Sequence, residues 1–477
     1  MNKFIVLQFI NGLLLLFKRI STYITVLILG IILTVDLVDA QYNQSPPNVI
    51  ILFTDDHGTL DVNSYGSNDL HTPNMDALAD RGVKFTQFYA AAAVCTPSRV
   101  GLLTGRYPLR VGLTGNAESH PTMFGDGNSL PQEEVTIAEM LQEAGYKTAQ
   151  IGKWHLGTSP GPNGQGFDYS FGFLGGVVDQ WSHFNYGQAP WGKPPRWHDL
   201  HRNGEEIWEA GTHIGDLIVR ESIDIMEAEH DQPFFLYLAF GLPHYPLHPY
   251  DHYMEHYKDL EEPRRSYAAS VSTTDEQIGR IVEKVDELGI RDNTLIIFQS
   301  DHGHSTEARA GYGGGNAGDY RGAKFSFFEG GIRVPAIASM PGTLPEGVVR
   351  DQIAHGTDWL PTIAEITGAD LPRVKLDGEN LLPVLLSDES ESPHDVLYWS
   401  EGMSENDQWA VRKGPWKLIG NPRDTSDKGE LTESDKLFLS NLEKDKTEMV
   451  NFAEQYPDIV KELTNLNQQL IEEIVNE

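Results

Sequence analysis

The same pattern occurs twice in the chain, at residues 48–58 and 293–303, and it limits the possible folds more than any other feature. "NVIILFTDDHG" and "NTLIIFQSDHG" each have a continuous apolar run, Val49–Phe53 or Leu295–Phe298, followed by polar residues that end in Asp-His-Gly. Continuous apolar runs are typical of parallel strands that are covered on both faces, whereas half-exposed strands alternate apolar and polar residues. The pattern therefore predicts two buried parallel strands with polar carboxyl ends.

Helical patterns lie between and around these strands. The segment 136–153 predicts a helix that ends at Gly145 and is followed by a strand, and 266–288 has amphipathic helical spacing. Alternation of strands and helices indicates an α/β fold: a large mixed, mostly parallel sheet sandwiched by helices. The segment 158–203 is rich in Gly, Pro and aromatic residues and predicts a long loop region over one face.

The character of the chain changes after about Leu371. "WAVRKGPWKLI" alternates like an antiparallel strand pair, and the tail from Tyr456 predicts an amphipathic helix. We therefore expect a catalytic domain at 41–370 and a smaller C-terminal α+β subdomain at 371–477, built on a short antiparallel sheet.

The first 40 residues predict a signal peptide. Lys3 and Lys18-Arg19 precede the apolar run at 24–35, and cleavage is expected before Gln41. An uncleaved membrane anchor is the alternative. No later segment is long and apolar enough to span a bilayer, so we expect an exported bacterial protein, periplasmic or secreted, with no stable membrane span after cleavage.

A formal net charge of −33 argues against nucleic acid as a partner. The same acidity makes an anionic substrate harder to bind, unless positive charge is concentrated in one pocket.

The carboxyl ends of the two predicted strands bring three carboxylates together. Asp55, Asp56 and Asp301 are expected at one edge of the sheet, where ligands gather in open α/β folds. Carboxylates at close range repel one another unless a cation neutralises them, and oxygen ligands favour Ca²⁺ or Mg²⁺. A single Asp-Gly at a strand end is usually only a turn or a helix cap, but two matched strand ends favour a metal site.

Cys95 is the single cysteine of the chain, so it has no partner for an internal disulfide. It is an apolar filler, an intermolecular bridge, a reactive thiol or a modification site. Thr96 and Pro97 follow it and predict a helix start, where the helix dipole favours a negative charge.

"CTPSR" followed by "LTGR" resembles the signature of the type I sulfatases, which belong to the alkaline-phosphatase-like superfamily. The strand segment at 48–58 and the motifs "GKWHLG", "PHYPLHP", "SDHG" and "FEGGIRVPA" match that family in order, and "LFLSNLEKDKTEMVNFAE" resembles its C-terminal subdomain. The resemblance implies that a formylglycine-generating enzyme or an anaerobic sulfatase-maturating enzyme converts Cys95 to 3-oxoalanine, also called formylglycine. One hydroxyl of the hydrated aldehyde then attacks sulfur and expels the substrate alcohol. The second hydroxyl loses its proton, which re-forms the aldehyde and releases sulfate.

The resemblance also implies a role for each matching residue. Asp55, Asp56, Asp301, His302 and the residue formed at Cys95 bind one Ca²⁺ per chain. Arg99 holds the hydrated aldehyde, and Lys153 and Lys324 neutralise the sulfate group. His155 acts as a base, and His244 donates a proton to the leaving alcohol or binds the sulfate.

At His302 the chain departs from the pattern. The family usually has an amide side chain at this position, and a ring nitrogen is a poorer ligand for a hard cation than an amide oxygen. Family members with histidine here resemble this chain, so the resemblance still implies activity, while direct ligation by His302 stays open.

The alcohol half of the substrate is predicted from the aromatic and basic residues of the loop region, which suit sugar rings and acidic groups. These residues are Trp181, His183, Tyr186, Trp191, Arg196, Trp197 and His198. The chain is similar to bacterial sulfatases of algal polysaccharides, which favours a sulfated saccharide of the ulvan or carrageenan type, with glycosaminoglycans as an alternative. Two further alternatives are a formylglycine-dependent phosphonate or phosphodiester hydrolase and an inactive, lectin-like sugar binder.

Overall fold

The computed structural model describes residues 46–117, 128–185, 197–228, 232–308, 311, 313–426 and 428–477. Residues Pro47–Glu477 form one compact unit. The expected signal peptide and three residues of the predicted sugar-binding loop, Tyr186, Trp191 and Arg196, lie outside the described residues. The division at residue 370/371 stays a prediction.

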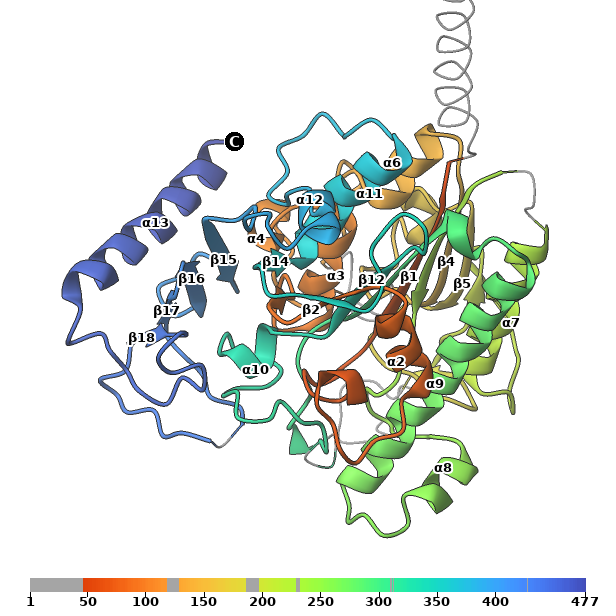
Figure 1. Ribbon diagram of the computed structural model, residues 1–477, viewed down its shortest axis with the longest axis horizontal. Coiled ribbons are helices and arrows are strands. Elements are labelled where there is room, and N and C mark those ends of the chain that lie inside the picture. The colour runs from red at the N-terminus through yellow and green to blue at the C-terminus, as the bar shows by residue number, and fades with distance from the viewer. Residues whose placement is uncertain are drawn as a thin grey trace, which may run out of the picture. The chain divides into compact units, whose positions relative to one another are not determined.

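A mixed sheet of ten strands forms the centre of this unit (Figure 1). Its strands, in spatial order, are β13 (Val348–Arg350), β2 (Val83–Phe85), β12 (Ala336–Ser339), β11 (Thr294–Ser300), β1 (Asn48–Thr54), β10 (Phe234–Ala239), β4 (Lys147–Lys153), β5 (Tyr169–Phe173), β8 (His201–Arg202) and β9 (Glu205–Glu206).

The two matched segments are neighbouring strands of this sheet. β1 pairs with β11 in parallel, and Thr54 lies opposite Ser300 at the carboxyl end of the pair. β10 and β4 continue the parallel part on the other side of β1, whereas β12 runs antiparallel to β11. The predicted fold class is confirmed, and both Asp-His-Gly segments leave the sheet side by side.

Helices cover both faces of the sheet, and the helices predicted at 136–145, at 266–288 and after Tyr456 are among them. The helices are α2 (Pro73–Asp80), α3 (Cys95–Thr104), α4 (Pro108–Val111), α6 (Ile137–Glu143), α7 (Ile214–Ala228), α8 (Asp251–His256), α9 (Arg264–Glu287), α10 (Glu329–Ile332), α11 (Trp359–Thr367), α12 (Leu382–Leu386) and α13 (Pro457–Asn476). Short 3₁₀ turns are η1 (Asn63–Tyr65), η2 (Pro162–Gln165), η3 (Arg291–Asn293) and η5 (Gly356–Asp358). Among the described residues, no helix combines the length and the apolar character needed to cross a bilayer.

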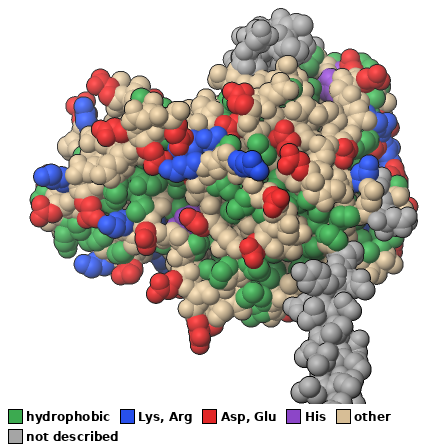
Figure 2. Space-filling model, turned by 90° about the horizontal axis from the view of Figure 1, so that it is seen from above, with side chains coloured by type: hydrophobic (Ala, Val, Ile, Leu, Met, Phe, Trp, Pro, Cys, Tyr) green, Lys and Arg blue, Asp and Glu red, His purple; other side chains and the backbone are tan. Residues whose placement is uncertain are grey.

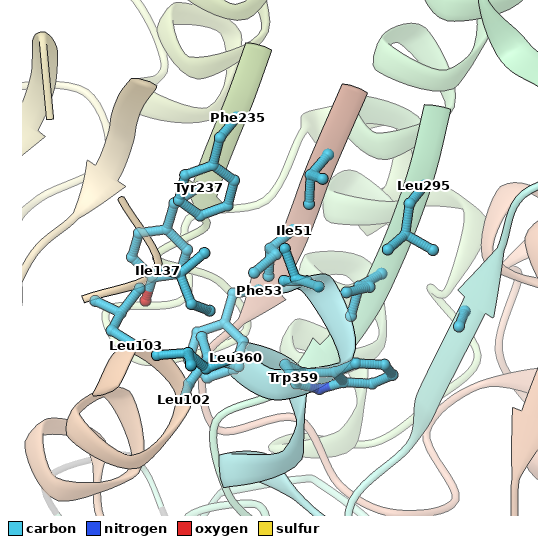
Figure 3. Packing of buried hydrophobic residues seen from close by; sticks show 14 of the residues in the cluster. Ile51, Phe53, Leu102, Leu103, Ile137, Phe235, Tyr237, Leu295, Trp359 and Leu360 are labelled. Carbon is cyan, nitrogen blue, oxygen red and sulfur yellow. The ribbon is translucent and has the colours of Figure 1, made fainter. Parts of the chain in front are cut away.

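Successive residues of β1 point into two different apolar cores, as strand geometry requires. Ile51 and Phe53 pack with α3, α6 and α11 on one face, where Leu102, Ile137 and Trp359 meet them (Figure 3). Ile50 and Leu52 pack with α2, α7 and α9 on the other face. Because both faces are buried, every residue of β1 from Val49 to Phe53 is apolar, and the polar residues that follow stand on a fully buried strand.

The C-terminal part forms a second, antiparallel sheet in the order β15 (Val396–Ser400), β16 (Trp409–Lys413), β17 (Trp416–Gly420) and β18 (Leu437–Asn441). Its Val411, Leu418 and Leu439 face α13. Its Trp399, Ala410 and Phe438 pack in a further cluster with Phe328 and Ile332, beside and within α10. The predicted strand pair and terminal helix are confirmed.

The region 158–203 differs from the expected loop. Residues Tyr169–Phe173 form β5, which pairs in parallel with β4 inside the large sheet. Within the same region, the short strands β6 (Phe184–Asn185) and β7 (Trp197–His198) pair with each other. Outside it, β3 (Phe88–Tyr89) and β14 (Ala354–His355) form another two-stranded pair. Gly172 has a φ of 138° and lies directly against the backbone of Gly152, so this glycine permits close strand contact and does not mark a loop.

Candidate active site

The carboxylates at the ends of β1 and β11 meet as predicted. Asp55 and Asp56 follow β1, and Asp301 and His302 follow β11. The backbone N–H of Asp56 donates to Asp301 Oδ1 at 3.1 Å, which joins the two strand ends directly. All four side chains are buried, so the charges that they carry are poorly screened by water.

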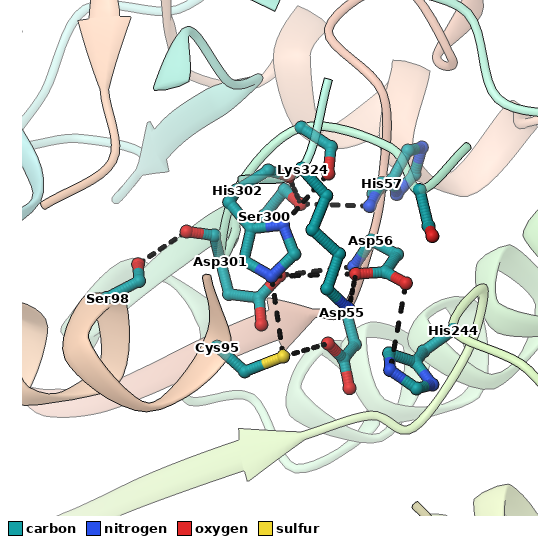
Figure 4. Close-up of polar contacts among 12 residues, drawn as sticks. Asp55, Asp56, His57, Cys95, Ser98, His244, Ser300, Asp301, His302 and Lys324 are labelled. Carbon is teal, nitrogen blue, oxygen red and sulfur yellow. Dashed lines mark hydrogen bonds and ion pairs between the residues drawn. The ribbon is translucent and has the colours of Figure 1, made fainter. Parts of the chain in front are cut away.

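Helix α3 brings the single cysteine to the same place (Figure 4). Cys95 is its first residue, and its Sγ lies 3.6 Å from Asp55 Oδ1 and 3.4 Å from His302 Nε2. One ligand atom from each of Asp55, Asp56, Cys95 and His302 lies within 4.8 Å of the others. Asp301 belongs beside this group, because its Oδ1 is 3.5 Å from His302 Nε2.

The donor set fits a hard cation. Among the described residues, Asp56 Oδ2 is buried without a hydrogen-bond partner, and His244 Nε2 lies 3.7 Å from it. A buried carboxylate oxygen in this state is costly unless a cation or a proton satisfies it. Carboxylate oxygens from three aspartates suit Ca²⁺ or Mg²⁺, and His302 stands where it can complete the coordination or hydrogen-bond to residue 95.

Three buried cationic side chains surround the carboxylates. Lys153 Nζ lies 2.5 Å from Asp55 Oδ2, and Lys324 Nζ lies 2.8 Å from Asp56 Oδ1. Arg99, one turn after Cys95 on α3, reaches Asp301 Oδ2 at 3.2 Å and Asp55 Oδ2 at 3.7 Å. The pocket therefore concentrates positive charge in a strongly acidic protein, as an anionic substrate requires.

These cations shift the ionisation of the groups between them. Burial would raise the pKa of Asp55, but Lys153 and Arg99 hold that pKa well below its usual value. Burial raises the pKa of Asp56 to about 7, although Lys324 and His302 oppose the shift. Burial would also raise the pKa of the Cys95 thiol, but Lys153 and Lys324 lower it to about 6. An anionic group at position 95 is thus favoured near neutral pH.

Both predicted catalytic histidines line the pocket. His155 follows β4, and its carbonyl oxygen accepts a hydrogen bond of 2.6 Å from Thr96 Oγ1, next to Cys95. His244 lies beside Asp56, and its Nδ1 is 2.6 Å from the carbonyl oxygen of Tyr245. Burial, with the nearby lysines, lowers the pKa of both imidazoles well below the usual value, so both rings are neutral at pH 7. A neutral ring can accept a proton, which fits the role expected for His155.

Sequence reasoning missed two tyrosines that support the site. Tyr237, on β10, accepts a hydrogen bond of 3.2 Å from Arg99 Nη1. Tyr267, on α9, accepts from the N–H of Gly58 at 3.0 Å and donates to the carbonyl oxygen of Asp56 at 3.1 Å. Tyr237 could have been noticed, because it is the one hydroxyl-bearing residue in the apolar strand "FFLYLA". Nothing in the sequence around Tyr267 distinguishes it from other residues of its helix.

All ten residues expected in the site lie in this one pocket or on its rim. They are Asp55, Asp56, Cys95, Arg99, Lys153, His155, His244, Asp301, His302 and Lys324. They come from the ends of β1, β4 and β11, from the start of α3 and from two loops. Individual chemical roles for them stay predictions.

Comparisons with known proteins agree with this geometry. The family model described as Sulfatase matches residues 47–369, and the one described as N-sulphoglucosamine sulphohydrolase, C-terminal, matches residues 320–475. Arylsulfatase A of Bos taurus is 35% identical over 405 residues, which are 81% of this chain and 77% of the bovine protein.

Two solved structures extend the comparison. Ps i-CgsB in complex with k-i-k-neocarrahexaose has a TM-score of 0.77 at 30% identity and covers 89% of this chain and 93% of its own. The PsFucS1 sulfatase from Pseudoalteromonas sp. has a TM-score of 0.74 at 27% identity and covers 92% of each chain.

Proposed function

This chain belongs to the sulfatase family, and we propose that it removes sulfate from a sulfated saccharide of the algal galactan type. The family match identifies the chain as a sulfatase, which is a sulfuric ester hydrolase. The saccharide, the modification of Cys95 and the identity of the metal belong to the proposal.

The observation that carries the proposal is the buried group around Cys95. A sulfate ester presents anionic oxygens, and Lys153, Lys324 and Arg99 place three cationic side chains around the ligand atoms of Asp55, Asp56, Cys95 and His302. Charges in a water-poor pocket act more strongly than charges at the surface. The pocket can therefore stabilise the extra negative charge that develops on the oxygens when sulfur is attacked.

Two groups complete the chemistry. Residue 95, once its thiol has been oxidised to an aldehyde, supplies a hydrated carbonyl whose hydroxyl is the nucleophile. Asp55, Asp56, Asp301 and His302 would hold a Ca²⁺, which when bound would supply Lewis-acid polarisation of the sulfate oxygens.

The remaining steps fall to the side chains of the chain itself. Arg99 orients residue 95 from the next turn of α3, and Tyr237 accepts a hydrogen bond from the guanidinium. Lys153 and Lys324 bind sulfate oxygens from two sides. His155, neutral and buried, accepts the proton that leaves the second hydroxyl when sulfate is released. Because the pKa of His244 is also lowered, this ring serves better for binding the sulfate than as a standing proton donor.

The saccharide part of the proposal rests on two lines of support. A structural relative at 30% identity holds k-i-k-neocarrahexaose, which is a saccharide ligand. In this chain Trp181 is 40% exposed and Trp208 is 63% exposed, and exposed indole rings can stack on sugar faces. We therefore favour a carrageenan-type galactan over ulvan and over glycosaminoglycans.

We further propose export and maturation. The basic residues and apolar run within residues 1–40 support a cleaved signal peptide, and an oxidising maturase in the host is needed for Cys95. Sequencing the N-terminus of the protein made in a bacterial host tests the cleavage; a start at Gln41 is expected, and an intact leader in the membrane fraction would contradict it.

The deciding experiment combines a mass and a rate. Protein made with a maturation enzyme is digested, the peptide containing residue 95 is weighed, and sulfate release from an aryl sulfate is measured on the same sample. We expect an aldehyde at position 95 and activity that scales with its fraction. Full activity with an unmodified thiol would overturn the mechanism, and Cys95→Ala is the matched inactive control.

A substrate panel separates the alternatives. Carrageenan, ulvan and glycosaminoglycan oligosaccharides are compared by sulfate release, alongside aryl phosphate and phosphonate esters. Faster turnover of the phosphorus esters would favour a phosphonate or phosphodiester hydrolase. Saccharide binding without release of sulfate by the matured protein would favour a sugar-binding homologue.

A further inference from the structure

The segment that carries Lys324 has an unusual backbone. Gly322 has a φ of 83° and Phe325 a φ of 70°, so left-handed positions stand on both sides of the lysine. Glycine adopts this conformation freely, but phenylalanine does so only when the surroundings impose it. The bend aims the buried Lys324 side chain at Asp56.

Residues of the C-terminal part hold this bend. The N–H of Gly322 donates to Ser426 Oγ at 2.9 Å, and the N–H of Ala323 donates to Thr425 Oγ1 at 3.1 Å. On the other side of the lysine, Ser326 Oγ donates to the carbonyl oxygen of Arg423 at 2.6 Å. The backbone of the segment is thus anchored from residues about a hundred positions later in the chain.

Arg321 and Glu329 fasten the two ends of the same segment. Arg321 Nε lies 2.6 Å from Asp424 Oδ2, and its guanidinium stacks 4.4 Å from the ring centre of Phe328. Glu329 Oε1 lies 2.7 Å from Lys417 Nζ, and both side chains are fully buried. These ion pairs limit how far the segment can move relative to the C-terminal sheet.

Gln408 acts at the strained residue itself. Its side chain is fully buried just before β16. Gln408 Nε2 donates to the carbonyl oxygen of Phe325 at 3.1 Å, and the N–H of Phe327 donates to Gln408 Oε1 at 3.2 Å. One amide therefore satisfies a backbone acceptor and a backbone donor on the two sides of Ser326, which fixes the left-handed turn after Lys324.

We propose that Gln408 and Thr425 are positioning residues for Lys324, so that the C-terminal sheet completes the sulfate-binding site. The proposal rests on the proposed sulfate chemistry, because Lys324 is the group that is positioned. Neither residue touches the reacting atoms. Their contribution is to keep the ammonium group of Lys324 at one place beside Asp56, where a sulfate oxygen meets it without reorganisation.

A purely structural role makes a different prediction. Docking of the C-terminal sheet against α10 is already provided by apolar contacts of Trp399, Ala410 and Phe438. If Gln408 and Thr425 only added to this docking, their loss would lower stability and leave sulfate affinity unchanged. If they position Lys324, their loss lowers the affinity for sulfate by more than an equal loss of stability elsewhere in the C-terminal sheet does.

The test compares Gln408→Leu with Val411→Ala. Leucine has a similar size but makes neither hydrogen bond, whereas Val411 is buried in the same strand region and faces α13. For Gln408→Leu we expect the inhibition constant of inorganic sulfate and the KM for an aryl sulfate to rise about tenfold, because the hydrogen bonds to Phe325 and Phe327 that hold the turn are lost. Calcium affinity should stay within twofold. Val411→Ala should lower the Tm and leave both sulfate constants unchanged.

Equal sulfate constants for Gln408→Leu and the wild type would overturn the proposal, as would a rise of the same size in Val411→Ala. If Gln408→Leu does not fold, Thr425→Ala takes its place, with Thr425→Ser as the variant that restores the hydroxyl. We expect Thr425→Ala to bind sulfate more weakly than the wild type and Thr425→Ser to recover the affinity. Calorimetric titration with inorganic sulfate measures the effect of the variants on sulfate affinity without any hydrolysis. If the protein hydrolyses no sulfate ester, the positioning of Lys324 is therefore still tested, and the failure of the proposed function is seen separately.

Discussion

Three residues in and beside the reaction pocket have left-handed backbones although they are not glycines. Asp56 has a φ of 59°, His155 of 52° and Phe325 of 70°. Such positions cost roughly 1–2 kcal/mol each for residues with a side chain, and they persist where neighbouring contacts impose them. Each of them aims a functional group: a carboxylate, an imidazole or the adjacent Lys324.

Tyr267 is one of the contacts that hold the backbone of Asp56 in this conformation. In Tyr267→Phe the carbonyl oxygen of Asp56 and the N–H of Gly58 lose their shared hydroxyl. We expect calcium affinity, measured by calorimetric titration, to fall about five- to tenfold.

Tyr65→Phe is the matched control, because Tyr65 donates to the carbonyl oxygen of Ala336, away from the site. It should lower the Tm and leave calcium affinity as in the wild type. A similar fall in both variants would show that the effect of Tyr267 is general destabilisation.

Arg99 is the buried cation between Asp55 and Asp301. Arg99→Met removes a buried cation from both carboxylates, and although Asp55 keeps its pair with Lys153, we expect a loss on the order of 3–5 kcal/mol in the free energy of unfolding. Added Ca²⁺ should restore much of this loss, since the ion neutralises the same carboxylates. Urea unfolding with and without Ca²⁺ measures both values.

Arg291→Met is the comparison for Arg99→Met. Arg291 is also buried, but it donates to the backbone oxygens of Thr294 and Ser339. Its effect on stability should be the same with and without Ca²⁺. If Ca²⁺ fails to rescue Arg99→Met, the carboxylates are not the metal ligands.

At the scale of elements, the turn η5 is sensitive to pH through His355. Burial lowers the pKa of His355 to about 3, and its Nδ1, 2.8 Å from Thr357 Oγ1, serves as an acceptor at the start of the turn. The unfolded chain binds this proton near pH 6.5 and the folded chain only near pH 3. The free energy of unfolding should therefore fall as the pH is lowered from about 6.5, by up to about 1.4 kcal/mol per pH unit.

The measurement for His355 is urea unfolding at several pH values between 7 and 4. His355→Gln keeps an amide acceptor and cannot be protonated, so its stability should fall less steeply than that of the wild type. Parallel curves would mean that other groups, such as the buried carboxylates, set the acid sensitivity.

The elements that could be predicted are those whose sequence reports their burial. β1 and β11 are continuous apolar runs, and α9 and α13 have clear apolar periodicity. β5 was missed because "YSFGF" contains a glycine and lies in a segment rich in glycine and aromatic residues. Its place in the sheet depends on close contact with β4, which is a tertiary property.

The same difference holds for the site. Asp55, Cys95 and Lys153 stand in local motifs, so their chemistry is readable from a few neighbouring letters. Gln408 and Thr425 are single polar residues in unremarkable surroundings, and only the folded chain brings them to the backbone around Lys324. Supports that act over long sequence separations leave no local pattern.

For the whole molecule, charge sets the expected response to salt. The chain carries a formal net charge of −33, and on the face seen in Figure 2 acidic side chains are scattered and not gathered in one patch. A polyanionic saccharide is repelled by such a surface until salt screens it, with a screening length of about 30 Å at 0.01 M and about 8 Å at 0.15 M.

We therefore expect kcat/KM for a sulfated oligosaccharide to rise severalfold between 0.01 and 0.15 M NaCl. An aryl sulfate carries a single charge and should respond much less. A fall in kcat/KM with salt for the oligosaccharide would instead reveal a cationic binding groove on the enzyme.

The burial of Cys95 limits when the residue can be modified. Its side chain is 1% exposed at the base of α3, under the carboxylates and lysines that later use it. A maturation enzyme cannot reach this residue in the folded protein. On the proposed mechanism, Cys95 is therefore oxidised after synthesis and before folding. On the same mechanism, a chain that folds before it meets the maturation enzyme keeps the thiol at position 95 and lacks the nucleophile.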